Sequence, residues 1–301
     1  MHTYFRAIGF SEPMKNLDRL NLMDDIMHKA SQRSYTTIRH IESSTPETES
    51  MRTEFSLDLG EGYGITLVGE YDEDEEFIYE DMFPYMFNGH ISTMEEITVE
   101  PRMDGYSYLG ICDDLKLGVT LIFRLRNTVD FLKNGGMTGE QQPGTSAALS
   151  ALSVEGTVML PIRKTEKEMQ MVRSQAVRRK KLMTAARTGD ENAMKDLTLG
   201  DMDTYSVILG RIQQQEDIYS LVDSTFMPTG VECDLYNVLG EIVHCRLTRN
   251  PYTLEEVYVM VIDCNDLKFT LCINKKDLYG EPAPGRRFKG TVWMQGEIHF
   301  G

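Results

Sequence analysis

The sequence lacks long apolar runs, a targeting segment and a cysteine framework. No stretch of eighteen apolar residues occurs, so we expect no helix that crosses a membrane. The first ten residues, MHTYFRAIGF, lack the basic-then-apolar pattern of a signal peptide. The five cysteines are odd in number and show no C-x-x-C spacing, which argues against a disulfide framework or a paired zinc motif. We therefore expect a cytoplasmic protein with free thiols.

Recognisable catalytic motifs are also missing. The sequence contains no G-x-x-x-x-G-K-[ST], G-x-S-x-G or H-E-x-x-H pattern, and its six histidines show no ligand spacing. Gly60, Gly62 and Gly64 lie between two strand patterns rather than before a helix, which indicates a hairpin turn and not a phosphate-binding loop. We therefore predict no catalytic residue, no metal ligand and no cofactor, and an enzyme becomes the less favoured reading.

Negative charge is abundant but unevenly distributed. The 301 residues carry a net charge of −16. Residues 1–150 hold 12 Lys and Arg against 26 Asp and Glu, a net charge of −14, whereas residues 151–301 hold 19 against 21, a net charge of −2. Because an acidic surface repels nucleic acid and anionic membranes, any contact with such partners is expected in the second half.

The first half shows mainly strand patterns. Apolar residues at helical spacing between Met14 and Ala30 predict one helix. Period-two alternation over 51–59 and 118–127 predicts antiparallel strands with one face in water. Residues 134–153 are rich in Gly, Ser, Thr and Gln, and we interpret them as a mobile loop.

The whole chain is predicted to form three consecutive parts of an α+β protein. Residues 1–162 would form a mainly antiparallel sheet with one helix, and residues 163–215 a central helical segment. From 216 to 301 the pattern is β again, with four or five strands in about 70 residues. This favours a small C-terminal β-barrel, of which the oligonucleotide/oligosaccharide-binding barrel is one candidate.

Positive charge is concentrated in the first helix of the helical segment. The candidate contact residues there are Arg173, Arg178, Arg179, Lys180 and Lys181. The run of four from Arg178 spans just over one helical turn, so its charges point all round the helix. The helix could contact phosphate groups or an acidic protein, and alternatively its charges could meet the acidic first half of the same molecule.

The last predicted strand places the single tryptophan among cations. Arg287, Lys289 and Trp293 fall on its polar face, opposite an apolar face. An indole beside two cations could stack on the bases of a single-stranded nucleic acid. The alternative is that Trp293 packs against a neighbouring domain or a partner protein.

Four stretches resemble an uncharacterised bacterial family, a domain of unknown function from anaerobic gut bacteria. They are YLGICDDLKLGVTLIFRLRN (108–127), TAARTGDENAMKDLTLGDMDTYSVI (184–208), FMPTGVECDLYNVLGEI (226–242) and GEPAPGRRFKGTVWMQGEIHF (280–300). The similarity extends over nearly the full length. It implies a bacterial cytoplasmic origin and carries over no activity and no site residues.

The leading hypothesis is a non-enzymatic binding or scaffolding protein with a protein partner. It would use the basic helix and the Trp293 face as contact surfaces. One alternative is a nucleic-acid-binding protein that uses the C-terminal barrel and the basic helix. A second alternative is an enzyme of an unrecognised class. No membrane partner is expected, and the sequence does not predict an oligomeric state.

Overall fold

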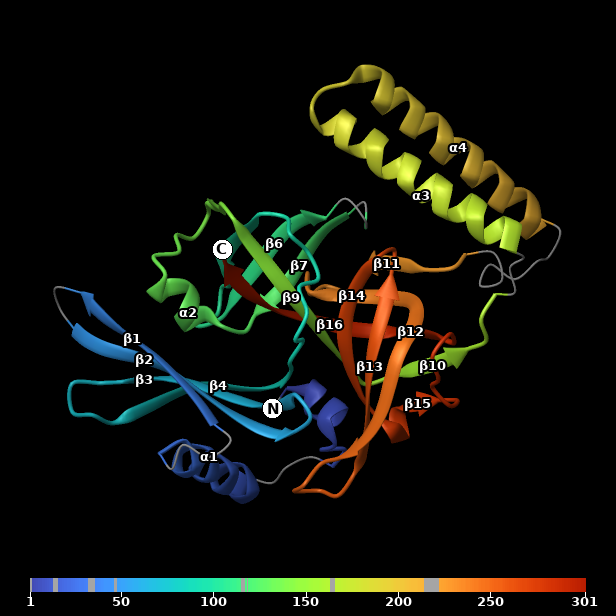
Figure 1. Cartoon of the computed structure of the whole chain (residues 1–301). Helices are drawn as coiled ribbons and strands as arrows, with labels where there is room; N and C mark the ends of the chain where they lie inside the picture. The colour runs from blue at the N-terminus through green and yellow to red at the C-terminus, as the bar shows by residue number, and fades with distance from the viewer. Residues whose placement is uncertain are drawn as a thin grey trace.

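The computed structural model describes residues 2–12, 16–31, 36–45, 48–114, 117, 119–162, 166–213 and 222–301. The described chain is built from a four-stranded sheet, a twelve-stranded sheet and a pair of long helices (Figure 1). No helix within these ranges is long and apolar enough to span a membrane.

The four-stranded sheet is antiparallel and follows the chain order. It consists of β1 (Thr36–Thr45), β2 (Thr48–Gly60), β3 (Tyr63–Tyr71) and β4 (Phe77–Met86). The turn between β2 and β3 has positive φ angles at Gly60, Glu61 and Gly62, which glycine adopts at little cost. Helix α1 (Asn16–Ser31) contacts β1 and β2 and buries Leu22 and Ile26.

The twelve-stranded sheet combines strands from both halves of the chain. Its members are β5 (Ile97–Pro101), β6 (Tyr108–Asp114), β7 (Val119–Leu125), β8 (Gln141–Gln142), β9 (Thr145–Ser153), β10 (Gly156–Met159), β11 (Thr225–Pro228), β12 (Leu235–Arg249), β13 (Glu256–Cys264), β14 (Leu267–Asn274), β15 (Leu278–Tyr279) and β16 (Arg287–Phe300). The strand order is β11-β12-β13-β14-β9-β16-β7-β6-β5-β8, and β10 pairs with β15 and β16. Strand β12 pairs with β16 as well as with β13. Three short helices complete the description: η1 (Thr3–Ile8), α2 (Thr128–Lys133) and η2 (Lys275–Asp277).

Two apolar cores hold these layers together. The larger core lies within the twelve-stranded sheet and contains Phe123, Phe269 and Phe288. The second core joins η1, α1 and the four-stranded sheet to the other face of β9, β13, β14 and β16, and it includes Phe5 and Trp293. Because the two cores share the long sheet as a wall, both of its faces are covered over these strands.

The expected fold class is wrong. The C-terminal strands do not close a small barrel of their own, because β16 pairs with β7 and β9 and β14 pairs with β9. They belong to one mixed sheet with strands from before residue 160. The expected central helical segment is also wrong, because these helices are not a structural part that joins two domains. Helices α3 (Glu166–Arg187) and α4 (Glu191–Gln213) are an excursion from that sheet (Figure 1).

Two local expectations are also wrong. The second half of the expected loop 134–153 is β9, a strand whose small residues are almost all buried. On the face that the alternation over 118–127 placed in water, Thr120 is exposed but Arg124 and Arg126 are both buried. The four-stranded sheet supplies their partners: Arg124 Nη2 lies 2.7 Å from Asp81 Oδ2, and Arg126 Nη1 donates to the Met86 carbonyl at 2.6 Å. A sheet that packs against another sheet leaves little of that face for water.

Candidate functional site

The candidate residues of the basic helix all lie on α3, which forms a hairpin with α4. The side chains of Arg178, Arg179 and Lys181 are exposed. Arg173 and Lys180 also lie on α3, but their side chains fall outside the described part of the structure. Figure 1 shows the two helices side by side, standing away from the four-stranded sheet. The structure therefore does not place the basic helix against β1–β4.

The turn between α3 and α4 follows from two consecutive residues in the sequence, Gly189 and Asp190. Gly189 has φ +89°, and its amide donates to the Ala186 carbonyl, which ends α3 in a left-handed cap. Asp190 then caps α4, because its Oδ1 accepts from the amides of Asn192 and Ala193 at 2.9 and 3.2 Å. A glycine stop followed directly by an aspartate start produces a tight helical hairpin.

Trp293 has no exposed surface. Its Nε1 donates to Asp234 Oδ2 at 2.8 Å, and its ring stacks on His2 with centroids 4.0 Å apart. Asp234 is itself fully buried and receives a second contact from Arg102 Nη1 at 3.1 Å. Burial holds the pKa of His2 at about 4, well below its ordinary value, so the stacked imidazole is neutral at pH 7. A sealed indole cannot stack on a nucleic-acid base, so Trp293 is a packing residue.

Arg287 is buried and ties the hairpin to the sheet. Its Nε donates to the carbonyl of Leu160 and its Nη1 to the carbonyl of Val222, each at 3.1 Å. Leu160 follows β10 and precedes α3, whereas Val222 follows α4 and precedes β11. One guanidinium thus holds both ends of the excursion that carries the hairpin. Its charge acts inside the molecule instead of on a partner.

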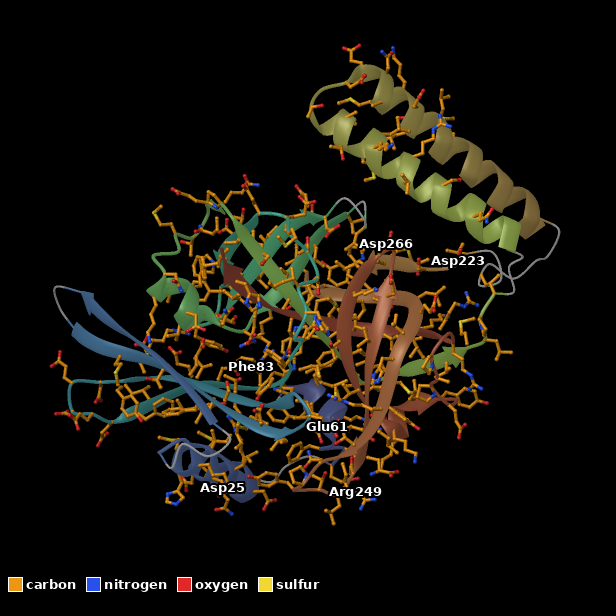
Figure 2. The ribbon with its side chains drawn as sticks, in the orientation of Figure 1. Asp25, Glu61, Phe83, Asp223, Arg249 and Asp266 are labelled. Carbon is orange, nitrogen blue, oxygen red and sulfur yellow. The ribbon has the colours of Figure 1, made fainter. Side chains whose placement is uncertain are left out.

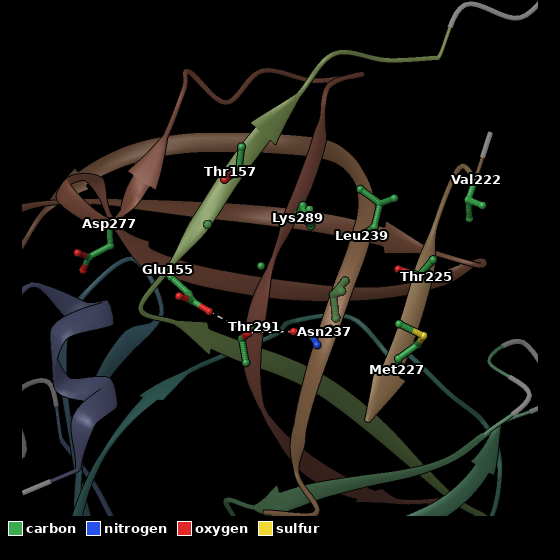
Figure 3. A pocket seen from close by; sticks show the side chains of 13 residues that line it. Glu155, Thr157, Val222, Thr225, Met227, Asn237, Leu239, Asp277, Lys289 and Thr291 are labelled. Atoms are coloured by element: carbon green, nitrogen blue, oxygen red, sulfur yellow. Dashed lines mark hydrogen bonds between the residues drawn. The ribbon is translucent and has the colours of Figure 1, made fainter. Parts of the chain in front are cut away.

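Lys289 lines a pocket of about 600 Å³ beside these ends (Figure 3). The walls come from β10, β11, β12 and β16, and the polar side chains around Lys289 include Glu155, Asn237, Asp277 and Thr291. The Asp277 carboxylate is already paired, because Arg6 Nε lies 2.7 Å from its Oδ2. The pocket is therefore mixed in polarity, with one compensated carboxylate.

The hydroxyl of Thr291 connects two acceptors in this pocket. Its Oγ1 lies 3.0 Å from Glu155 Oε1 and 3.0 Å from Asn237 Oδ1, and the dashed lines in Figure 3 mark both contacts. A hydroxyl has one proton to donate, so it satisfies one of the two oxygens at a time. The pocket can thus accept a hydrogen bond from the hydroxyl or amine of a small ligand.

Sequence reasoning did not find this pocket. Asn237 and Thr291 are opposite each other in the β12–β16 pairing, although 54 positions separate them in the chain. Neither residue belongs to a recognisable motif, and only the strand pairing reveals their proximity. Among the residues that the structure describes, no three His, Cys, Asp or Glu side chains gather as metal ligands.

The fold and these sites define a β-rich protein of two packed sheets that presents a basic helical hairpin. The chain belongs to the family described as "Domain of unknown function, E. rectale Gene description (DUF3881)", whose model matches residues 5–296. The similarity predicted from the four sequence stretches is thereby confirmed. No curated protein matches the chain, and no solved structure matches it.

Proposed function

We propose that this protein is a non-enzymatic binding or scaffolding protein of the cytoplasm, and that the α3–α4 hairpin is its contact element. One observation carries the proposal: the hairpin exposes apolar and basic side chains together. Val177 and Leu199 have 59% and 60% of their surface exposed, and Met194 is exposed as well. Large apolar side chains exposed on a projecting element are a feature of protein-binding surfaces.

The charge of the hairpin indicates the chemistry of the partner. Helix α3 holds seven Lys and Arg against two Glu, a net charge of +5, whereas α4 holds two against four, a net charge of −2. Exposed apolar groups next to a cationic helix favour an acidic protein surface with apolar residues of its own. Arg287 holds Leu160 and Val222, the points where the chain leaves the sheet and returns to it, which suits an element that presents a surface to a partner.

Fewer observations support the alternative of a nucleic-acid-binding protein. It requires the C-terminal barrel and the basic helix, but the C-terminal strands form no barrel of their own and the indole of Trp293 is buried. The alternative now depends on α3 alone, whose charges point all round the helix. It is therefore best treated as one outcome of the test below.

Charge reversal on α3 tests the proposal. The variant Arg178→Glu/Arg179→Glu/Lys181→Glu and the control Lys195→Glu on exposed α4 are used as bait in native lysate, with and without nuclease. We expect a protein that is recovered equally in both nuclease arms, lost with the triple variant and retained with the control. Recovery that nuclease abolishes would support nucleic-acid binding instead. Recovery that is unchanged by the triple variant would refute the hairpin as the contact element.

A further inference from the structure

A second cavity, of about 810 Å³, lies between the turn after β2, the end of β4 and the strands β12, β13 and β14. Figure 2 labels Glu61 in this turn, where the four-stranded sheet meets the long strands. The side chains that bear on its chemistry are Glu61, Phe87, His90, His244, Arg246 and Lys268. We call this hollow the β12–β14 cavity. It shares no lining residue with the pocket beside Lys289.

The strand register explains why these groups converge. His244 pairs with Val261, and Val261 pairs with Thr270, so the three form one row across β12, β13 and β14. Because side chains alternate between faces, Arg246 and Lys268 share the face of that row. Neighbouring strands lie about 4.8 Å apart, so the groups on β12 and β14 are roughly 10 Å from each other at the backbone.

The opposite wall is held in place by hydrogen bonds. Arg246 Nε lies 2.7 Å from Glu61 Oε2, and its Nη2 donates to the Glu61 carbonyl at 2.6 Å. The amide of Phe87 donates to the carbonyl of Gly62 at 2.6 Å. The next residue, Asn88, is tied to β14, since its Oδ1 accepts from Thr270 Oγ1 at 3.1 Å. The cavity is thus formed before any ligand arrives, which lowers the entropic cost of binding.

The lining of the β12–β14 cavity includes a cation, Lys268, and an aromatic side chain, Phe87. Lys268 is exposed, and its Nζ forms a long salt bridge with Asp263 Oδ2 at 3.8 Å, which is beyond hydrogen-bond distance. His90 and His244 line the same cavity and are also exposed. Phe87 has 45% of its surface exposed. A cation with two imidazoles and an aromatic face is a combination that recognises an anion attached to a flat ring.

We propose that the β12–β14 cavity binds a nucleoside monophosphate. Its phosphate would lie against Lys268 and the imidazoles of His90 and His244, which can donate hydrogen bonds to its oxygens. Its base would stack on Phe87, in a cavity whose apolar lining includes Met86, Val259 and Val261, as bases do on aromatic side chains. The volume is within the range of small-molecule sites. This site is separate from the hairpin and does not depend on the function proposed above.

Calorimetric titration of the full chain with adenosine monophosphate tests the proposal. The parallel arms are adenosine and inorganic phosphate. We expect the monophosphate to bind at least about tenfold more tightly than either fragment, because ring and phosphate each contribute. Inorganic phosphate that binds as tightly as the monophosphate would overturn the proposal, since the ring would then contribute nothing.

Two exposed substitutions locate the site. Lys268→Ala and Phe87→Ala should each weaken binding of the monophosphate by about tenfold, the loss of one charge-assisted hydrogen bond or one stacked base. The matched control is Lys133→Ala on α2, an exposed lysine that does not line the cavity, which should bind as the parent does. No measurable binding to the parent up to about 1 mM, or equal binding by parent and Lys268→Ala, would refute the assignment.

Discussion

The burial of Trp293 leads to a sharp prediction for its replacement by phenylalanine. The change removes the indole N–H that donates to Asp234 Oδ2. Losing a hydrogen bond to a charged group in the interior costs about 2 kcal/mol. The smaller ring leaves space in a core where Trp293 has no exposed surface, which costs about 1 kcal/mol more. We therefore expect Trp293→Phe to lower the free energy of unfolding by about 3 kcal/mol.

The buried surroundings of Asp234 offer little to replace the hydrogen bond that the substitution removes. Its other oxygen, Oδ1, is buried without a hydrogen-bond partner among the described residues, and Arg102 is the remaining partner of Oδ2. No solvent reaches Asp234, which is fully buried. Removing the indole N–H would therefore leave the Asp234 carboxyl group with one hydrogen-bond donor fewer.

Urea unfolding followed by circular dichroism measures the effect, with Tyr279→Phe at an exposed ring as the control. Because Trp293 is the single tryptophan, the fluorescence of the parent gives an independent reading. We expect emission at short wavelength and weak quenching by acrylamide. A loss of stability below about 1 kcal/mol, or an emission spectrum typical of an exposed indole, would contradict the reasoning.

Three further predictions concern the hairpin attachment, the thiols and the pH dependence of stability. Arg287→Met should speed limited proteolysis between residues 160 and 222 roughly fivefold, because the carbonyls of Leu160 and Val222 each lose a hydrogen bond. An unchanged rate of proteolysis would refute the role of Arg287 in holding these two residues. In the native protein a thiol reagent should label exposed Cys233 but not Cys112 or Cys264, whose pKa burial raises to about 12, as mass spectrometry would show. Burial lowers the pKa of His2 from 6.5 to about 4, so below 6.5 the unfolded chain binds a proton that the folded chain does not. Stability should therefore fall between pH 7 and pH 5, and His2→Asn should abolish about 2 kcal/mol of that fall in unfolding experiments; an equal fall in both proteins would refute the assignment.

Local patterns in the sequence predicted elements better than they predicted packing. The apolar spacing between Met14 and Ala30 indicated a helix where α1 lies, and the alternation over 51–59 indicated β2. The same alternation predicted a face in water that is in fact buried, with Arg52 only 7% exposed. Periodicity reports which side chains share a face, but it does not report whether a second sheet covers the polar one.

The sites could be predicted only in part. Positive charge on α3 was evident from composition, whereas the roles of Arg287 and Trp293 were not. Both residues lie on β16, whose neighbours β7 and β9 come from far away in the chain. A cation and an indole on a polar face look the same in sequence whether they meet solvent, a carbonyl or a carboxylate. Strand order decides between these environments, and strand order is not encoded in any short stretch.

The attachment of the hairpin through one arginine has a consequence for engineering the chain. Leu160 and Val222 are brought to the same guanidinium, so the polypeptide leaves the sheet and returns to it at one place. The intervening residues could be replaced by a short linker, or by a different helical module, without moving any strand of the body. The two sheets would then serve as a constant scaffold on which different hairpins can be compared.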